Sequence, residues 1–220
     1  MSLDSLYFHK ALGYRFIGHH SLAFNPSFYK DLAECNANIS ECHLCPLCKI
    51  RQSSILISAG ANKLENKADN VSSKASQSSA LFVSLLAYPG IERDIAMFKG
   101  LLAPKLINAH FAFLLKCAPS ANGFENFNKN ANIDFSIAQC KAYFDMELKA
   151  LSPRVIIALG AKVFRTLMGQ SECAYTSLRG GLYRLGDRLI MPTHDLALLA
   201  KNPSLKCEVI ADLHKLKALL

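Results

Sequence analysis

The amino-acid sequence predicts an α/β fold in which a mainly parallel β-sheet is covered by helices on both faces. Four short apolar runs have the length and composition of buried strands, and each ends in a polar or turn-forming cluster. Segments with helical spacing separate these runs, and such alternation is typical of parallel sheets. The predicted strands are 81–86, 110–115, 154–159 and 188–191.

The clearest helical segment precedes the third predicted strand. Apolar residues recur there every three or four positions and would share one face of a helix. They are Ile137, Cys140, Phe144, Leu148 and Leu151. Two polar tracts, 62–80 and 120–134, are expected to be surface insertions. We therefore expect one domain over residues 1–220, with an N-terminal extension at 1–34.

The charge balance favours a polyanionic partner such as nucleic acid. Lys and Arg total 25 against 17 Asp and Glu, and the formal net charge is +8. The N-terminus lacks a secretory signal pattern, and no run approaches the roughly 18 apolar residues that span a bilayer. We therefore expect a cytoplasmic protein without membrane contact. In that reducing compartment, clustered cysteines indicate metal binding or catalysis rather than disulfides.

Four of the eight cysteines lie near the N-terminus: Cys35, Cys42, Cys45 and Cys48. The C-x2-C pair of Cys42 and Cys45 places two thiolates on one tight turn, within reach of one zinc or iron centre. The other two N-terminal cysteines would complete a local site, either a ferredoxin-like site or one of the kind found in a zinc-knuckle binding protein. Alternatively, Cys117 at a strand end and Cys140 on the following helix would complete the ligand set.

Ligands of parallel α/β sheets bind beyond the carboxyl ends of the strands. The loops at these ends are 88–90, 116–119, 160–161 and 192–195, and any active site should be built from them.

A set of motifs runs in order from about Cys42 to the C-terminus. It comprises Cys42-x2-Cys45-Pro46-Leu47, Lys116-Cys117, Cys140, residues 153–160, Arg179-Gly180, Pro192-Thr193-His194 and Asn202-Pro203. This ordered set resembles the iron-sulfur uracil-DNA glycosylases, family 4 of their superfamily. The resemblance implies a three-layer α/β/α fold around a four-stranded parallel sheet. It also implies a 4Fe-4S cluster on four ligands: Cys42, Cys45, Cys117 and Cys140.

The resemblance further implies a DNA-repair enzyme that hydrolyses the N-glycosidic bond of uracil or a related damaged base in DNA. We expect it to be a monomer. The family motif Gly-Glu-Ala-Pro-Gly corresponds to residues 86–90, so Tyr88, Pro89 and Gly90 would line the base pocket. The glutamate of that motif is Ala87 here. Asp94, which follows the motif, would orient the attacking water or stabilise the sugar cation.

Two further motifs depart from the family pattern. Phe98 corresponds to the family's base-stacking aromatic residue, and Phe113 replaces an asparagine that reads the uracil edge. His194 is retained and would donate a hydrogen bond to the departing base anion, whereas Asp195 replaces the proline that follows it. Because Ala87 and Phe113 depart from the pattern, the alternative is a catalytically silent iron-sulfur homologue that binds DNA. Candidate phosphate contacts are Arg51, Arg179 and Lys201.

Overall fold

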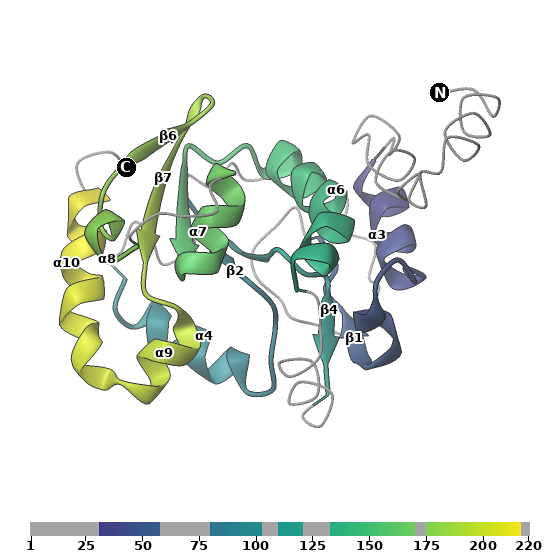
Figure 1. Ribbon diagram of the computed structural model, residues 1–220, viewed down its shortest axis with the longest axis horizontal. Helices are drawn as coiled ribbons and strands as arrows, with labels where there is room; N and C mark the ends of the chain where they lie inside the picture. Colours follow the sequence, from purple (N-terminus) through teal and green to yellow (C-terminus); the bar gives the residue numbers. More distant parts are fainter. Residues whose placement is uncertain (1–30, 58–79, 103–109, 121–132, 170–174, 217–220) are drawn as a thin grey trace, which may run out of the picture.

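The computed structural model describes residues 31–57, 80–102, 110–120, 133–169 and 175–216 (Figure 1). At its centre lies a five-stranded sheet with the strand order β3-β2-β5-β7-β6. The strands are β2 (Ala80–Ser84), β3 (His110–Phe113), β5 (Val155–Leu159), β6 (Tyr183–Leu185) and β7 (Arg188–Thr193). The first four in this order pair in parallel, which confirms the predicted four-stranded parallel sheet, and β6 adds an antiparallel edge.

Helices follow the strands in the alternating order that the sequence predicts. They are α3 (Leu32–Ser40), α4 (Ile91–Lys99), α6 (Ile133–Leu151), α7 (Ala161–Met168), α8 (Tyr175–Leu178), α9 (Leu196–Lys201) and α10 (Lys206–Leu216). The predicted amphipathic segment is α6, and its residues Phe144 and Leu151 pack against the sheet. Among the described residues, none of the helices has both the length and the apolar character needed to span a bilayer.

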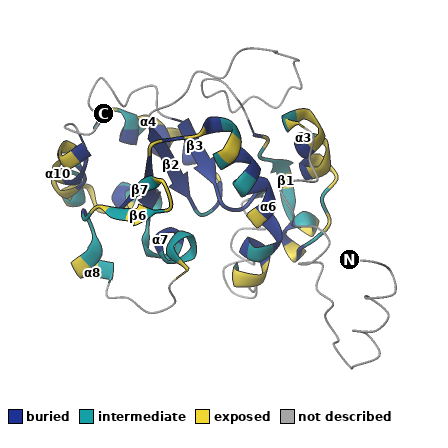
Figure 2. Cartoon of the chain, turned by 90° about the horizontal axis from the view of Figure 1, so that it is seen from above, coloured by how far each residue is buried: buried dark blue, intermediate teal, exposed yellow. Residues whose placement is uncertain are grey.

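Side chains that alternate along each buried strand divide the core into two layers. In β2, Phe82 joins a cluster with residues of α4, α9 and α10, whereas Leu81 and Val83 join residues of α6 and α7. The helices therefore cover opposite faces of the sheet, and the strands between them are almost wholly buried (Figure 2). This arrangement is the three-layer α/β/α architecture that the sequence predicts.

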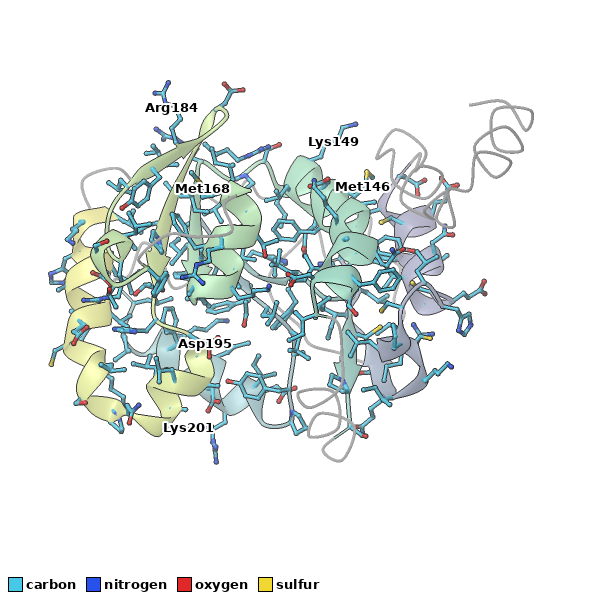
Figure 3. The ribbon with its side chains drawn as sticks, viewed as in Figure 1. Met146, Lys149, Met168, Arg184, Asp195 and Lys201 are labelled. Atoms are coloured by element: carbon cyan, nitrogen blue, oxygen red, sulfur yellow. The ribbon has the colours of Figure 1, made fainter. Side chains whose placement is uncertain are left out.

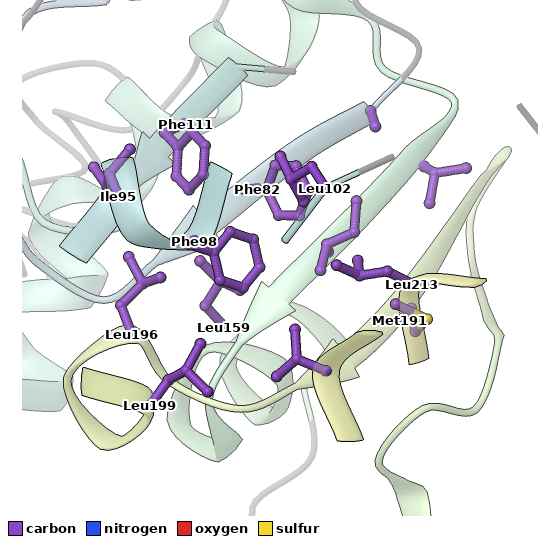
Figure 4. Close-up of a cluster of buried hydrophobic side chains, with 14 of the residues drawn as sticks. Phe82, Ile95, Phe98, Leu102, Phe111, Leu159, Met191, Leu196, Leu199 and Leu213 are labelled. Atoms are coloured by element: carbon purple, nitrogen blue, oxygen red, sulfur yellow. The ribbon is translucent and has the colours of Figure 1, made fainter. Parts of the chain in front are cut away.

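The layer under α4 is built around three aromatic rings (Figure 4). The ring of Phe82 stacks on that of Phe111 at a centroid distance of 4.9 Å, and Phe98 meets both rings edge-on. Offset-stacked and edge-to-face pairs are the favoured geometries of aromatic side chains. These rings fix α4, and therefore the loop that precedes it, against the sheet.

A second, two-stranded sheet was not predicted. Its strands β1 (Arg51–Ser54) and β4 (Cys117–Pro119) pair antiparallel, with Ser54 opposite Cys117. β1 directly follows the 3-10 helix Pro46–Lys49, so the pairing carries the N-terminal cysteine segment to the chain beyond β3. The predicted extension at 1–34 and insertions at 62–80 and 120–134 lie almost entirely outside the described residues.

Candidate functional site

Three cysteine thiols meet where the small sheet reaches α6. The Cys45 sulfur accepts hydrogen bonds from the thiols of Cys117 and Cys140, and none of the three residues is more than 5% exposed. These shared hydrogen bonds lower the pKa of Cys45 and raise the pKa of both partners, which burial raises further. The pairing of β1 with β4 explains how residues so distant in sequence come together.

The remaining cysteines of the N-terminal segment differ in their surroundings. Cys42 is half-buried and lies close enough to Cys117 for its charge to act on that thiol. Cys35 is fully buried between α3 and α6, and burial raises its pKa to about 11, so it remains a neutral thiol. Cys48 is half-buried. The structure thus brings the distant pair, Cys117 and Cys140, to the C-x2-C segment.

The donor set fits an iron-sulfur cluster by its chemistry. Iron-sulfur clusters are held by cysteine thiolates and tuned by charges and hydrogen bonds around the sulfurs. The guanidinium of Arg51 acts on Cys117, and the backbone of Lys116 hydrogen-bonds to Cys140. Within the described part of the chain, no group of three or more His, Cys, Asp or Glu side chains is arranged to hold a single metal ion. A four-iron cluster is larger than an ion, and its ligands need not converge on one point.

A second group of polar side chains lies beyond the carboxyl ends of β2 and β7. The Tyr88 hydroxyl donates a 2.7 Å hydrogen bond to Oδ2 of Asp94, which is only 6% exposed in the first turn of α4. Burial, together with this hydrogen bond, raises the pKa of Tyr88. Pro89 and Gly90 form the exposed turn that begins α4. The site therefore holds a shielded carboxylate fixed by a phenol.

Asp195 adds a second carboxylate to this group. Its Oδ1 caps α9 by accepting hydrogen bonds from the backbone N–H groups of Ala197 and Leu198, at 2.9 and 3.3 Å. Its other face packs on Gly160, where an added Cβ would lie 3.2 Å from the Asp195 Cβ. Burial raises the pKa of Asp195, and the nearby charge of Asp94 adds to the rise. The carboxylates of Asp94 and Asp195 thus lie at the same edge of the sheet, and the pKa of Asp195 is higher than that of an ordinary aspartate.

His194 follows β7 and is held by the C-terminal helix. Its Nε2 lies 2.9 Å from Oε2 of Glu208 on α10, and the imidazole side chain is 13% exposed. Arg179 also contacts Glu208, at 2.8 Å. The retained histidine therefore belongs to a network of charged side chains.

The two aromatic residues predicted to contact the base are buried in the core. Phe98 is fully buried against Phe82 and Phe111, and Phe113 is 2% exposed within the same cluster. The ring of Phe98 is therefore not open to a flipped base in this conformation, and base stacking by Phe98 stays a prediction. The physical reason is that Phe98 lies on the apolar face of α4, together with Ile91 and Ile95, and that face meets the sheet.

The three predicted phosphate contacts also have different roles. Arg51 donates to the carbonyl oxygens of Ile39 and Ser40 and so caps the end of α3. The charge of Arg179 is neutralised by two carboxylates. Lys201 alone of the three is exposed, and in Figure 3 its side chain points away from the body of the protein below Asp195. Lys201 is therefore the residue of this set that remains open to a phosphate.

A buried ion pair lies beside the cysteines. The Lys116 ammonium is 2.6 Å from Oε2 of Glu147, and both side chains are at most 3% exposed. His110 approaches Oε1 of the same carboxylate at 3.5 Å, and the ammonium lies 5.7 Å from the centre of the Phe144 ring. Because Lys116 precedes Cys117 and Glu147 lies two turns after Cys140, the pair joins the two elements that carry these cysteines.

Sequence reasoning missed Tyr175, Glu208 and Asp212. All three are brought to the end of β7 by α8 and α10, whose positions depend on tertiary packing. A glutamate or aspartate on an amphipathic helix is ordinarily predicted to face solvent, so the sequence gives no reason to place it in a site. In the sequence, only the Arg179-Gly180 motif pointed to this group of residues, because Gly180 lies against Asp212.

The fold and the strand-end residues together define an α/β protein with a polar site at the carboxyl edge of a parallel sheet. The sequence pattern of the uracil DNA glycosylase superfamily matches residues 13–214. Because the match covers most of the chain, the protein belongs to this superfamily. No curated protein matches the sequence. Membership supports a glycosylase role in DNA repair and an interaction with DNA.

Proposed function

We propose that the protein is a DNA glycosylase that hydrolyses the N-glycosidic bond of uracil or a related damaged base. The observation that carries this proposal is the shielded carboxylate of Asp94, bonded to Tyr88 beside Asp195 at the strand ends. Enzymes of this kind must extract the nucleotide, hold the base and shield the reacting sugar from bulk water. A fixed, buried carboxylate at the site of ligand binding meets the last of these needs.

The chemistry assigns a separate task to each residue. The bond between C1′ and the base nitrogen breaks, the base keeps the electron pair, and positive charge develops on the sugar. The carboxylate of Asp94 stabilises that charge and accepts the proton that water loses as its oxygen adds to C1′. His194 donates a hydrogen bond to the base as negative charge develops on it. The exposed Lys201 holds a neighbouring phosphate.

The departures from the family pattern favour a second candidate function. Ala87 and Phe113 are both buried and apolar, so neither position offers a polar group to the base. Losing a well-placed hydrogen-bonding pair costs about 1–3 kcal/mol of discrimination. The second candidate is therefore an iron-sulfur homologue that binds DNA without cleaving it.

An assay with labelled oligonucleotides that carry single lesions separates the two functions. Duplex and single-stranded DNA containing uracil, hypoxanthine or another damaged base is incubated with the protein, and abasic sites are then cleaved. We expect one lesion to be excised in preference to undamaged bases. Salt-dependent binding to DNA without excision of any lesion would instead support the silent homologue.

We also propose that Cys42, Cys45, Cys117 and Cys140 hold a 4Fe-4S cluster. The contacts of Cys45 with the other two buried thiols, and the position of Cys42 beside Cys117, support this set. When bound, the cluster would contribute structural cross-linking among the N-terminal segment, β4 and α6. The chain supplies the sulfur ligands and the neighbouring charge of Arg51.

Replacing Cys140 with Ser should remove most of the protein's iron and its broad visible absorbance, because one of four thiolate ligands is lost. Cys48→Ser is the matched control and should retain both. Iron content and visible spectra of freshly purified, oxygen-protected samples measure the effect. Loss of iron from Cys48→Ser but not from Cys140→Ser would assign the metal to a local N-terminal site, and colourless protein containing zinc would reject the cluster.

A further inference from the structure

A buried serine lies on the side of α6 that meets the thiol group. Ser136 precedes Cys140 by one helical turn and is 0% exposed. Ile137 and Cys140 of the same helix pack in one apolar cluster with Cys45 and Cys117. Because residues four positions apart lie one above the other on a helix, Ser136 shares the face of α6 that carries Cys140.

The hydroxyl of Ser136 is shielded from solvent and has no hydrogen-bond partner among the described residues. A serine within a helix ordinarily turns its hydroxyl to solvent or donates to a carbonyl oxygen one turn earlier. Ser136 acts on Cys45 and lowers the pKa of that thiol, although its approach does not complete a hydrogen bond. Buried polar groups are almost always paired, so an unpaired hydroxyl beside this sulfur indicates an acceptor that forms when a ligand binds.

Binding of iron would change which groups can donate to Cys45. In the structure, the thiols of Cys117 and Cys140 donate to its sulfur. A cysteine binds iron as a thiolate, so neither residue could still donate with a cluster in place. Among the described groups that act on Cys45, the donors that remain are the backbone N–H of Leu47 and the hydroxyl of Ser136. Since Cys45 is 5% exposed, water has little access to replace them.

The other two sulfurs have neighbours of a different kind. The charge of Arg51 acts on Cys117, and the backbone of Lys116 hydrogen-bonds to Cys140. Ser136 differs from both, because it offers an uncharged donor on a side chain. Its hydroxyl can therefore be removed without changing the cysteine ligands, the backbone or the net charge.

We propose that Ser136 sets the reduction potential of the cysteine centre: with a 4Fe-4S cluster bound, its hydroxyl donates a hydrogen bond to the thiolate sulfur of Cys45. This inference rests on the cluster proposed above. One-electron reduction adds one negative charge to the cluster and its sulfurs. A donor at a ligand sulfur stabilises that charge, so the hydrogen bond favours the reduced form.

Ser136→Ala should therefore make the cluster harder to reduce. At a fixed potential, the ratio of reduced to oxidised cluster should fall about tenfold, which corresponds to a shift of about 59 mV to lower potential for one electron. Voltammetry of the protein purified with its cluster measures the shift, and the electrode supplies the electron. Alanine favours helix, so α6 should be retained. Ser136→Thr keeps a hydroxyl and should return the potential towards the wild-type value.

Ser152→Ala is the matched control. It removes a hydroxyl just beyond the opposite end of α6, where Ser152 donates to the carbonyl oxygen of Lys149 at 2.8 Å. The potential of this variant should equal that of the wild type. An unchanged potential in Ser136→Ala at full iron content would overturn the proposal, and so would an equal shift in Ser152→Ala.

Resonance Raman spectra in H₂O and D₂O test the same hydrogen bond without reducing the cluster. Deuteration of the hydroxyl should shift an iron–cysteine stretching band in the wild-type protein and in Ser136→Thr, and the shift should be smaller in Ser136→Ala. Equal shifts in the wild type and Ser136→Ala would contradict the hydrogen bond. Wild-type protein without iron would reject the proposed cluster together with this inference. A cluster that is present but does not respond to Ser136→Ala would reject the inference alone.

Discussion

Asp94→Asn should lower the single-turnover rate of base excision by about a hundredfold to ten-thousandfold, the range typical of a lost general base. The asparagine has the same shape and can still accept the 2.7 Å hydrogen bond of Tyr88, so the site should remain folded. It cannot accept the proton of the attacking water or offset positive charge on the sugar. Because Asp94 is 6% exposed, bulk solvent cannot replace the missing charge.

The control for Asp94 lies two residues earlier in the same turn of α4. Glu92 is exposed, and Glu92→Gln removes an equal charge from the same loop. Its rate should stay within a few-fold of the wild type, and its thermal unfolding should match that of Asp94→Asn. Equal losses in both variants would show a general electrostatic effect of the loop. An undiminished rate in Asp94→Asn would remove this residue from the reaction.

Glu147→Gln should lower the free energy of unfolding by about 3–5 kcal/mol, because it leaves the Lys116 ammonium buried without a partner. The contact is 2.6 Å long between side chains that water hardly reaches, so solvent screening is slight. Burial acts to raise the pKa of Glu147, but the charges and hydrogen bonds of Lys116 and His110 outweigh it and lower the pKa. The stabilisation is therefore present above the ordinary pKa of a glutamate and is lost as the pH falls through the depressed value.

Urea unfolding followed by circular dichroism measures this loss, and α6 supplies its own control. Asp145 forms an exposed ion pair with Lys141 at the same distance, 2.6 Å. Asp145→Asn should therefore cost no more than about 0.5 kcal/mol. Replacing both Lys116 and Glu147 with apolar residues of similar size should recover much of the stability that Glu147→Gln loses. Similar losses in the free energy of unfolding for Glu147→Gln and Asp145→Asn would contradict the claim that burial makes the Lys116–Glu147 pair important for stability.

The parallel strands could be predicted because each is a continuous apolar run buried on both faces. β7 is such a case, since Ile190 and Met191 contribute to opposite layers of the core. The edge strand β6 could not be predicted in this way: it has three residues, and none is fully buried. β1 was missed for the same reason, because its sequence, Arg-Gln-Ser-Ser, carries no apolar pattern.

The candidate site was predictable only where residues follow strands directly. Tyr88, His194 and Asp195 fall at strand ends because the topology places them there. The role of Phe98 was not predictable from its spacing, since a helix that starts at the site also buries one face. Glu208 meets His194 only through the docking of α10, which depends on contacts of Val209 and Leu213 with the core. No local pattern encodes such a contact.

The order of strands in the large sheet separates the cysteine group from the polar side chains at the end of β7. Cys117 lies beyond β3 and His194 beyond β7, with β2 and β5 between them. Three strand spacings of about 5 Å each separate the ends of β3 and β7 by roughly 15 Å. Oxidation of the cysteines would therefore affect the side chains at the strand ends indirectly, by destabilising the sheet between them, and not by direct contact. Because of the same separation, substitutions at the strand ends should leave the contacts among Cys45, Cys117 and Cys140 intact.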